Sequence, residues 1–151
     1  MLTELLVGLP VMLICLALQA GFATLCMNFY LRYNRTHTGP SGFLRSSLLL
    51  SMVMLTMLLS NFLQMALWAA LFRLLGEFDS ASAALYFSGV TFATLGYGDV
   101  VLSPEWRLLG PLEAANGILM FGVSTAVMTA AVMDVLKRNT AAQRLEQRQG
   151  D

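Results

Sequence analysis

Charged residues are scarce in this chain, and their scarcity excludes most classes of soluble protein. Only 12% of the 151 residues are Asp, Glu, Lys or Arg, whereas soluble domains usually carry about 25%. Hydrophobic residues make up 57% of the chain, and the mean hydropathy is +0.68. A chain with this balance has too few polar groups to cover a water-exposed surface, so the composition predicts a membrane protein.

Cysteine and histidine are also rare, which limits the chemistry available to the protein. Cys15 and Cys26 lie in one apolar stretch, about 16 Å apart along a helix and therefore too far for a disulfide. We interpret both as small packing residues. No intramembrane His, Cys–His or Ser–Lys constellation is present in the sequence, so an enzyme is not expected. The net charge of zero indicates no nucleic-acid partner.

Three apolar runs are long enough to cross a bilayer as helices. They cover residues 5–31, 46–72 and 111–136, and at about 1.5 Å per residue each exceeds the roughly 30 Å hydrocarbon core. A fourth apolar segment, residues 80–93, reaches only about 20 Å and leads into a glycine-rich stretch. We interpret it as a re-entrant helix, because irregular backbone at membrane depth must be buried in protein or line water.

Several residues mark where these helices begin. Asp79 and Ser80 suit the start of the short helix, because their side chains accept hydrogen bonds from free N–H groups. The sequence SPE at residues 103–105 has the pattern of a cap followed by proline, which predicts that the last helix spans residues 104–137. Pro111 would then lie inside that helix and bend it.

Basic residues are distributed unevenly around the apolar runs. Seven of the nine Lys and Arg residues lie between the first two runs or after the third, and such a bias predicts the cytoplasmic side. The N-terminus is then outside, and the C-terminus is cytoplasmic. We expect a multi-pass protein of a cell membrane, and the compactness of the chain favours a bacterial inner membrane. The seven residues are Arg32, Arg35, Arg45, Lys137, Arg138, Arg144 and Arg148.

The stretch TLGYGDV, residues 94–100, places glycine at alternate positions beside an aspartate. Gly96 and Gly98 adopt positive φ at little cost, so they permit a backbone whose successive carbonyl groups point toward one axis. Such carbonyl groups can replace the water shell of a cation as it crosses the bilayer. The side chains of Leu95 and Tyr97 would point away from this axis and brace the ring that the carbonyl groups form around it. The short helix would end at the ring, where the negative end of its dipole favours a cation.

The sequence Thr-Leu-Gly-Tyr-Gly-Asp at residues 94–99 resembles the selectivity-filter signature of the potassium-channel family, which usually has Val in place of Leu95. The resemblance extends to the order of outer helix, pore helix, filter and inner helix over residues 43–137. It implies that K⁺ is the permeant ion and that backbone carbonyl groups and one threonine hydroxyl bind it. These groups belong to Thr94, Leu95, Gly96 and Tyr97.

The same resemblance implies roles for the residues that surround the filter. Gly98 would shape the outer mouth of the pore, and Asp99 would be tied to the pore helix behind the filter. Tyr86 or Phe87 would match the aromatic residues that pad the filter. No helix carries arginine at every third position, so a voltage sensor is not expected.

Two departures from the family pattern bear on selectivity. Ala93 replaces the usual second threonine, and Leu95 replaces a smaller branched residue. Both changes affect side chains around a backbone site, so we expect potassium selectivity to survive. A loosened filter that also admits sodium is the alternative, which would make the protein a poorly selective cation channel.

One chain supplies one filter strand, whereas a ring of carbonyl groups needs four. Closed symmetry is the ordinary way to obtain four strands from one gene product, so we expect a homotetramer in the lipid bilayer. The absence of an internal repeat of the loop argues against a transporter that carries four such loops. A non-conducting membrane subunit that modulates other channels remains a further alternative.

The predicted fold is an all-α membrane protein with three transmembrane helices, a re-entrant pore helix and a filter loop, assembled as a tetrameric pore. The chain divides into four parts on this interpretation. They are an extra N-terminal transmembrane helix (1–31), a cytoplasmic loop (32–45), a pore domain (46–137, with pore helix 80–93, filter 94–99 and inner helix 104–137) and a cytoplasmic tail (138–151).

Polar and small residues inside the apolar runs are further candidates for function. Glu113 is costly at membrane depth and invites a functional hypothesis: it hydrogen-bonds behind the filter, attracts cations in the cavity with Asn116, or is solvated at the interface. Gly117 and Gly122 are candidates for a gating hinge or for close helix packing. Asn61 and Gln64 are expected to form hydrogen bonds between helices; these two residues lie in the second apolar run.

Overall fold

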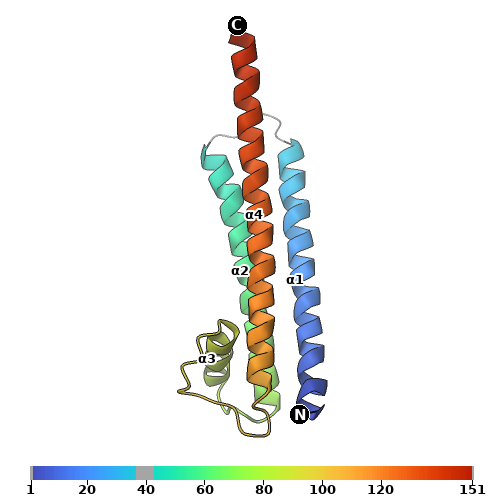
Figure 1. The fold of residues 1–151 in the computed structure, drawn as a ribbon, viewed down its shortest axis with the longest axis vertical. Helices are drawn as coiled ribbons and strands as arrows, with labels where there is room; N and C mark the ends of the chain where they lie inside the picture. Colours follow the sequence, from blue (N-terminus) through green and yellow to red (C-terminus); the bar gives the residue numbers. More distant parts are fainter. Residues whose placement is uncertain (1, 37–42, 151) are drawn as a thin grey trace.

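The computed structural model describes residues 2–36 and 43–150, with side chains described for residues 2–33 and 44–140. Every regular element in these ranges is a helix (Figure 1). Three of the four helices contain a span long and apolar enough to cross a membrane, and the fourth is short. The predicted all-α membrane fold is therefore confirmed. The helices are α1 (Leu2–Thr36), α2 (Phe43–Leu74), α3 (Ala81–Phe92) and α4 (Leu109–Gly150).

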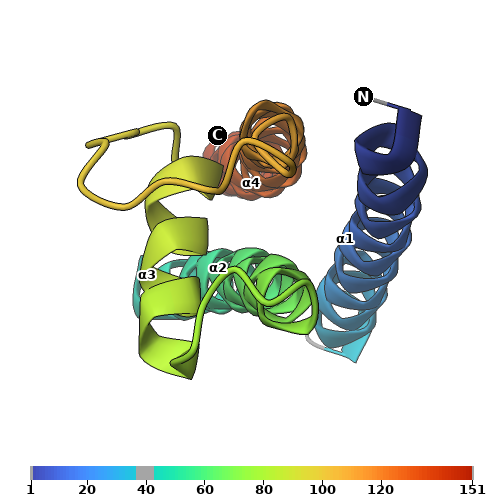
Figure 2. The ribbon, with the colours of Figure 1, turned by 90° about the horizontal axis from the view of Figure 1, so that it is seen from below.

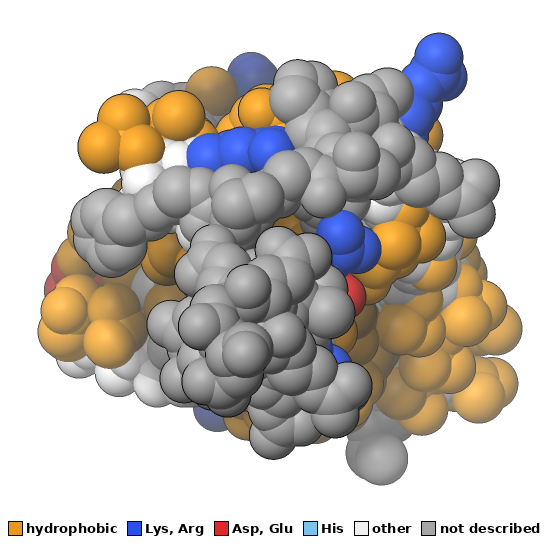
Figure 3. All heavy atoms as spheres, turned by 90° about the horizontal axis from the view of Figure 1, so that it is seen from above, with side chains coloured by type: hydrophobic (Ala, Val, Ile, Leu, Met, Phe, Trp, Pro, Cys, Tyr) orange, Lys and Arg blue, Asp and Glu red, His pale blue; other side chains and the backbone are white. Residues whose placement is uncertain are grey.

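The three long helices form a bundle, and α3 packs at one end of it. Helices α1 and α4 run in the same direction, α2 runs against them, and α3 lies at the end where α1 and α4 begin (Figure 1). Seen along the bundle, α2 and α4 lie between α1 and α3 (Figure 2). Lys and Arg side chains gather at the opposite end (Figure 3). The loop that follows α3 and the N-terminus therefore share one end of the molecule.

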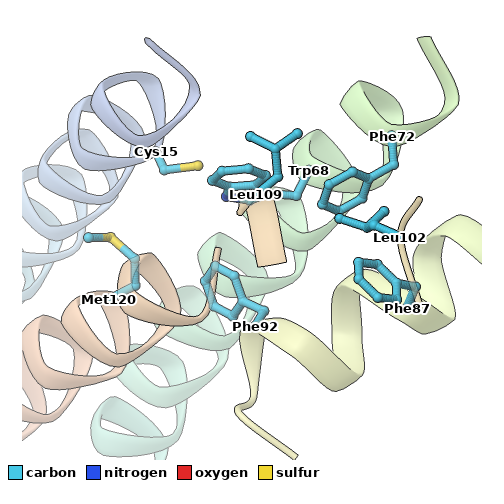
Figure 4. Packing of buried hydrophobic residues seen from close by; sticks show 8 residues of the cluster. All are labelled: Cys15, Trp68, Phe72, Phe87, Phe92, Leu102, Leu109 and Met120. Atoms are coloured by element: carbon cyan, nitrogen blue, oxygen red, sulfur yellow. The ribbon is translucent and has the colours of Figure 1, made fainter. Parts of the chain in front are cut away.

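The main hydrophobic core lies beneath α3 and joins all four helices. Phe72 on α2 packs edge-on against Phe87 on α3, with ring centroids 5.2 Å apart. Cys15 extends this cluster to α1, and its thiol is free (Figure 4). A second buried cluster joins α1, α2 and α4 in the other half of the bundle and includes the free thiol of Cys26. Both cysteines thus pack within helix interfaces, as expected from the sequence.

Outside these clusters, large apolar side chains cover the outer faces of the long helices. Leu55 on α2 and Ile118 on α4 are more than half exposed in the single chain, and many leucine and methionine side chains are exposed in the same way. A soluble monomer rarely exposes so much contiguous apolar surface. This surface requires a lipid bilayer or further protein around it.

Helix α3 begins where the sequence predicts. Ser80 is its N-cap residue, with extended φ and ψ of −105° and 142°, and its side chain accepts a hydrogen bond from Ala83 N at 3.1 Å. Ala93 is the C-cap residue. The helix therefore ends one residue before the TLGYGDV stretch and delivers the chain directly into it.

Helix α4 begins at Leu109 instead of Pro104, which corrects the predicted start. The reason is a contact that no local pattern reveals. Glu77, just after α2, accepts hydrogen bonds from Ser103 N at 2.7 Å and from Ser103 Oγ at 2.8 Å. Ser103 is thus held by the turn that follows α2 and does not cap α4. Pro111 consequently lies in the first turn of α4, where its missing N–H costs nothing.

The remaining helix bounds also differ from the predicted segments. Helix α1 continues past residue 31 to Thr36, and α4 continues through Lys137 to Gly150, so polar residues beyond the apolar spans remain helical. Pro10 lies inside α1, which is assigned as one continuous helix. Residues 37–42 of the predicted cytoplasmic loop lie outside the described residues.

Candidate functional site

The backbone after α3 alternates in the sign of φ. Thr94, Gly96 and Gly98 have φ of +59°, +54° and +76°, whereas Leu95 and Tyr97 do not have positive φ. A regular helix or strand keeps φ negative throughout, so this segment is neither. The sequence predicts positive φ at the two glycines but not at Thr94, where a β-branched residue resists it. Residues 94–98 therefore have the alternating geometry that a carbonyl-lined path requires.

Hydrogen bonds fasten the start of this segment to the end of α3. Val90 O accepts from Leu95 N at 2.9 Å, and Thr91 O accepts from Thr94 N at 2.9 Å. These carbonyl groups belong to the last turn of α3, which otherwise leaves them without helical partners. The strained φ of Thr94 is thus compensated by bonds that turn the chain back along α3.

The side chains of Leu95 and Tyr97 are exposed in the single chain. Leu95 is 56% exposed and Tyr97 is 66% exposed. The loop that carries them lies on the side of the bundle away from α1 (Figure 2). Between this loop and α3 lies a hollow of about 330 Å³ whose lining includes Gly96, Gly98 and Val90. In a single chain the segment lacks the surrounding protein that would brace it.

The two aromatic candidates on α3 have different roles in the structure. Tyr86 Oη donates a hydrogen bond to Asp99 Oδ2 at 2.7 Å, so the end of the stretch 94–99 is tied to α3. This hydrogen bond raises the pKa of the Tyr86 phenol. Phe87 instead packs its ring against Phe72 and Phe78. Tyr86 is therefore the residue that supports the segment directly.

On the channel function that the sequence resemblance implies, replacing Tyr86 with phenylalanine is expected to lower potassium flux about fivefold. The change keeps the ring but removes a hydrogen bond to a carboxylate at this half-exposed position. The measurement is flux into liposomes that contain equal amounts of assembled wild-type and variant protein. Unchanged flux from Tyr86→Phe would show that the Asp99 tie does not support the segment.

Glu113 and Asn116 lie behind α3, within the bundle. Both side chains are fully buried in the single chain, on the α4 face that packs against the other helices. Glu113 Oε1 hydrogen-bonds the hydroxyl of Ser88 on α3, and Ser88 Oγ also lies 2.8 Å from Met65 O on α2. Glu113 thus forms a hydrogen bond to the helix that precedes residues 94–98, which is compatible with the first of the alternatives given above for this residue.

Gly117 and Gly122 occupy different surroundings on α4. A Cβ atom added to Gly117 would lie 2.0 Å from Phe92 O, whereas a Cβ added to Gly122 would meet nothing within 4 Å. Phe92 is the last residue of α3, two residues before Thr94. Gly117 therefore permits the backbones of α3 and α4 to touch, two residues before the alternating segment begins. Gly122 has no such packing role within the chain.

Reasoning from the sequence did not single out Gln19, a buried polar residue between the long helices. Gln19 is 1% exposed and forms hydrogen bonds with side chains of both α2 and α4. Asn61 and Gln64, which the sequence predicts as interhelical hydrogen bonders, belong to the same network. The available signal was a glutamine near the middle of the first apolar run, since such a side chain is costly in lipid unless it is paired.

Comparison with known proteins adds independent evidence about this region. No curated protein and no solved structure matches the chain significantly. Residues 56–134 match the protein family described as "Ion channel". The match runs from the middle of α2 through α3 and the alternating segment into α4, and it covers more than half of the chain. The chain is a multi-pass membrane protein, and it belongs to this ion channel family.

Proposed function

We propose that the protein is a potassium-selective channel that conducts K⁺ passively as a homotetramer. The observation that carries the proposal is the alternation of φ at Thr94, Gly96 and Gly98. Alternation lets consecutive peptide groups present their carbonyl oxygens to one side, and a ring of such oxygens can substitute for the hydration shell of K⁺. The ion would be held by the carbonyl groups of Thr94–Tyr97 and by the Thr94 hydroxyl.

The arrangement of helices supports a pore built from four copies. The filter segment lies on the side of the bundle away from α1, so four copies can bring four segments to one axis while α1 stays outside (Figure 2). The exposed side chains of Leu95 and Tyr97 would then contact neighbouring protein instead of solvent. The C-terminal end of α3 would point its negative dipole toward the ion. The filter end would face outward and the basic end the cytoplasm of a bacterial cell.

A poorly selective cation channel is the second candidate, and two residues favour it. Ala93, the C-cap residue of α3, offers no hydroxyl where the family usually has threonine. Leu95 is larger than the usual valine and is exposed in the single chain, so its fit depends on the neighbouring copy. Both changes act on the packing around the carbonyl ring. A ring held less firmly would discriminate less sharply between K⁺ and Na⁺.

Ion flux into liposomes tests the proposal. Purified protein is expected to support K⁺ uptake that barium blocks, with Na⁺ uptake at least about tenfold slower, equivalent to about 1.4 kcal/mol of discrimination. Protein-free liposomes serve as the control, and crosslinking in the bilayer measures the number of copies. Equal K⁺ and Na⁺ uptake would support the poorly selective channel. No flux from well-folded tetramers would support a non-conducting modulatory subunit.

A further inference from the structure

Helices α1 and α4 are joined by hydrogen bonds at three levels along their length. Near the filter end, Glu4 Oε1 accepts from Leu108 N at 3.1 Å, immediately before α4 begins. In the middle, Gln19 Nε2 donates to Ser124 Oγ at 3.0 Å. Toward the basic end, Tyr30 Oη donates to Asp134 Oδ2 at 2.9 Å. Because the helices run in the same direction, these ties follow almost the whole apolar span of α4 (Figure 1).

Of the three hydrogen-bonded contacts, the middle one, at Gln19, involves the most partners. Gln19 Oε1 accepts hydrogen bonds from Ser60 Oγ and from Gln64 Nε2, each at 2.7 Å, while Gln19 Nε2 donates to Ser124. Ser60 and Gln64 belong to α2, whereas Ser124 belongs to α4. One amide on α1 therefore links the outer and inner helices, and Gln19, Ser60 and Gln64 are almost completely buried.

The packing at the filter end holds the same two helices close together. A Cβ added to Gly8 on α1 would lie 2.8 Å from a methyl carbon of Leu112 on α4. At the other end, Asp134 is shared between Tyr30 and Arg138, whose Nε lies 2.7 Å from the same carboxylate oxygen. Helix α1 thus follows α4 from its first turn to the edge of its apolar span.

We propose that α1 is a strut that restrains the inner helix of the channel, and that Gln19 is the positioning residue that sets the restraint. The inference rests on the proposed function, because only in a pore does α4 line the path of the ion. For α4 to tilt relative to α2, the amide of Gln19 must give up its bonds to one of the two helices. Buried polar groups in a bilayer find no water to replace such bonds.

The strut predicts a change in gating without a change in permeation. Gln19→Met keeps the size of the side chain and removes its polar atoms. The conformation in which Gln19 bonds both α2 and α4 should therefore become less populated. At about 0.6–1.7 kcal/mol per interhelical hydrogen bond, the ratio of open to closed times should shift about three- to twentyfold. Ser124→Ala should shift it in the same direction. Unit conductance and the K⁺/Na⁺ ratio should stay at wild-type values.

The test is a double-mutant cycle on single channels in planar bilayers. Gln19→Met and Ser124→Ala should be non-additive, because both remove the Gln19–Ser124 bond, while Gln19→Met also removes the bonds to Ser60 and Gln64 and Ser124→Ala also removes the bond from Asn61. The matched control is Thr24→Val on α1, since Thr24 Oγ1 donates to Ala20 O of its own helix, at 2.8 Å, and this bond does not reach α4. Thr24→Val should leave the open-to-closed ratio unchanged and should combine additively with Ser124→Ala.

Additive effects in the Gln19–Ser124 cycle, or a wild-type gating ratio in Gln19→Met, would overturn the inference. Reduced yield of tetramers with unchanged gating would also overturn it, because that result indicates a purely structural role. If Gln19→Met fails to fold, Ser124→Ala reports the same tie from the other side. Hydrogen exchange of α4 amides from 124 to 134 gives a readout independent of conduction. Exchange should be faster in Ser124→Ala than in Thr24→Val, and equal rates would refute the strut even if the wild type passes no ions.

Discussion

Replacing Gly117 with alanine is expected to abolish potassium flux and to lower the yield of assembled protein. The new Cβ would lie 2.0 Å from Phe92 O and 2.9 Å from Phe92 C, so α3 and α4 must separate. Both atoms belong to the backbone and cannot rotate out of the way, which places the cost near the upper end of the overpacking range, about 3 kcal/mol. Because Phe92 precedes the filter segment by two residues, the displacement reaches Thr94 directly. Liposome flux and native gel electrophoresis measure the two effects.

Gly122→Ala is the matched control on the same helix. Nothing lies within 4 Å of the added Cβ in the single chain, and alanine is the better helix former by about 1 kcal/mol. Its tetramer yield and thermal stability should equal or exceed those of the wild type. Wild-type assembly and flux in Gly117→Ala would contradict the packing role of Gly117. A gating defect confined to Gly122→Ala would instead identify Gly122 as a hinge.

Replacing Gly96 with alanine is expected to abolish conduction while leaving most of the protein folded. Gly96 has φ of +54°, and a Cβ added there would meet no atom within 4 Å in the single chain. The penalty is therefore the backbone strain of a left-handed L-residue, about 1–2 kcal/mol. The chain relieves this strain most easily by returning φ to negative values, which breaks the alternation and removes one ring of carbonyl groups from the path. Flux per folded tetramer is the quantity to measure.

Gly76→Ala is the control for the backbone strain that an alanine causes at positive φ. Gly76 has φ of +78° and equally open surroundings, but it lies in the turn between α2 and α3. This variant should lose comparable stability while it keeps its potassium flux per folded tetramer. Conduction by Gly96→Ala at the wild-type rate would remove the basis for assigning residues 94–98 as an ion filter.

Much of the architecture follows from local features of the sequence. Length and hydropathy of the apolar runs determine that three helices span a bilayer, because the backbone must satisfy its own hydrogen bonds in lipid. Ser80 marks the start of α3 by a cap that involves only neighbouring residues. Gly96 and Gly98 indicate positive φ because glycine lacks a Cβ. Each of these signals operates within a few residues of the chain.

Only the tertiary structure determines features that depend on partners distant in sequence. Helix α4 starts at Leu109 because Glu77 accepts hydrogen bonds from Ser103. Glycine is required at position 117 because the backbone of Phe92 packs directly against it. The positions of Glu113 behind α3 and of Gln19 between α2 and α4 follow from helix packing. Composition and periodicity show which faces are apolar, but not which atoms meet across them. The sequence alone therefore determines the class of membrane fold and the stretch that we propose as the filter, whereas close packing between helices decides what holds that stretch in place.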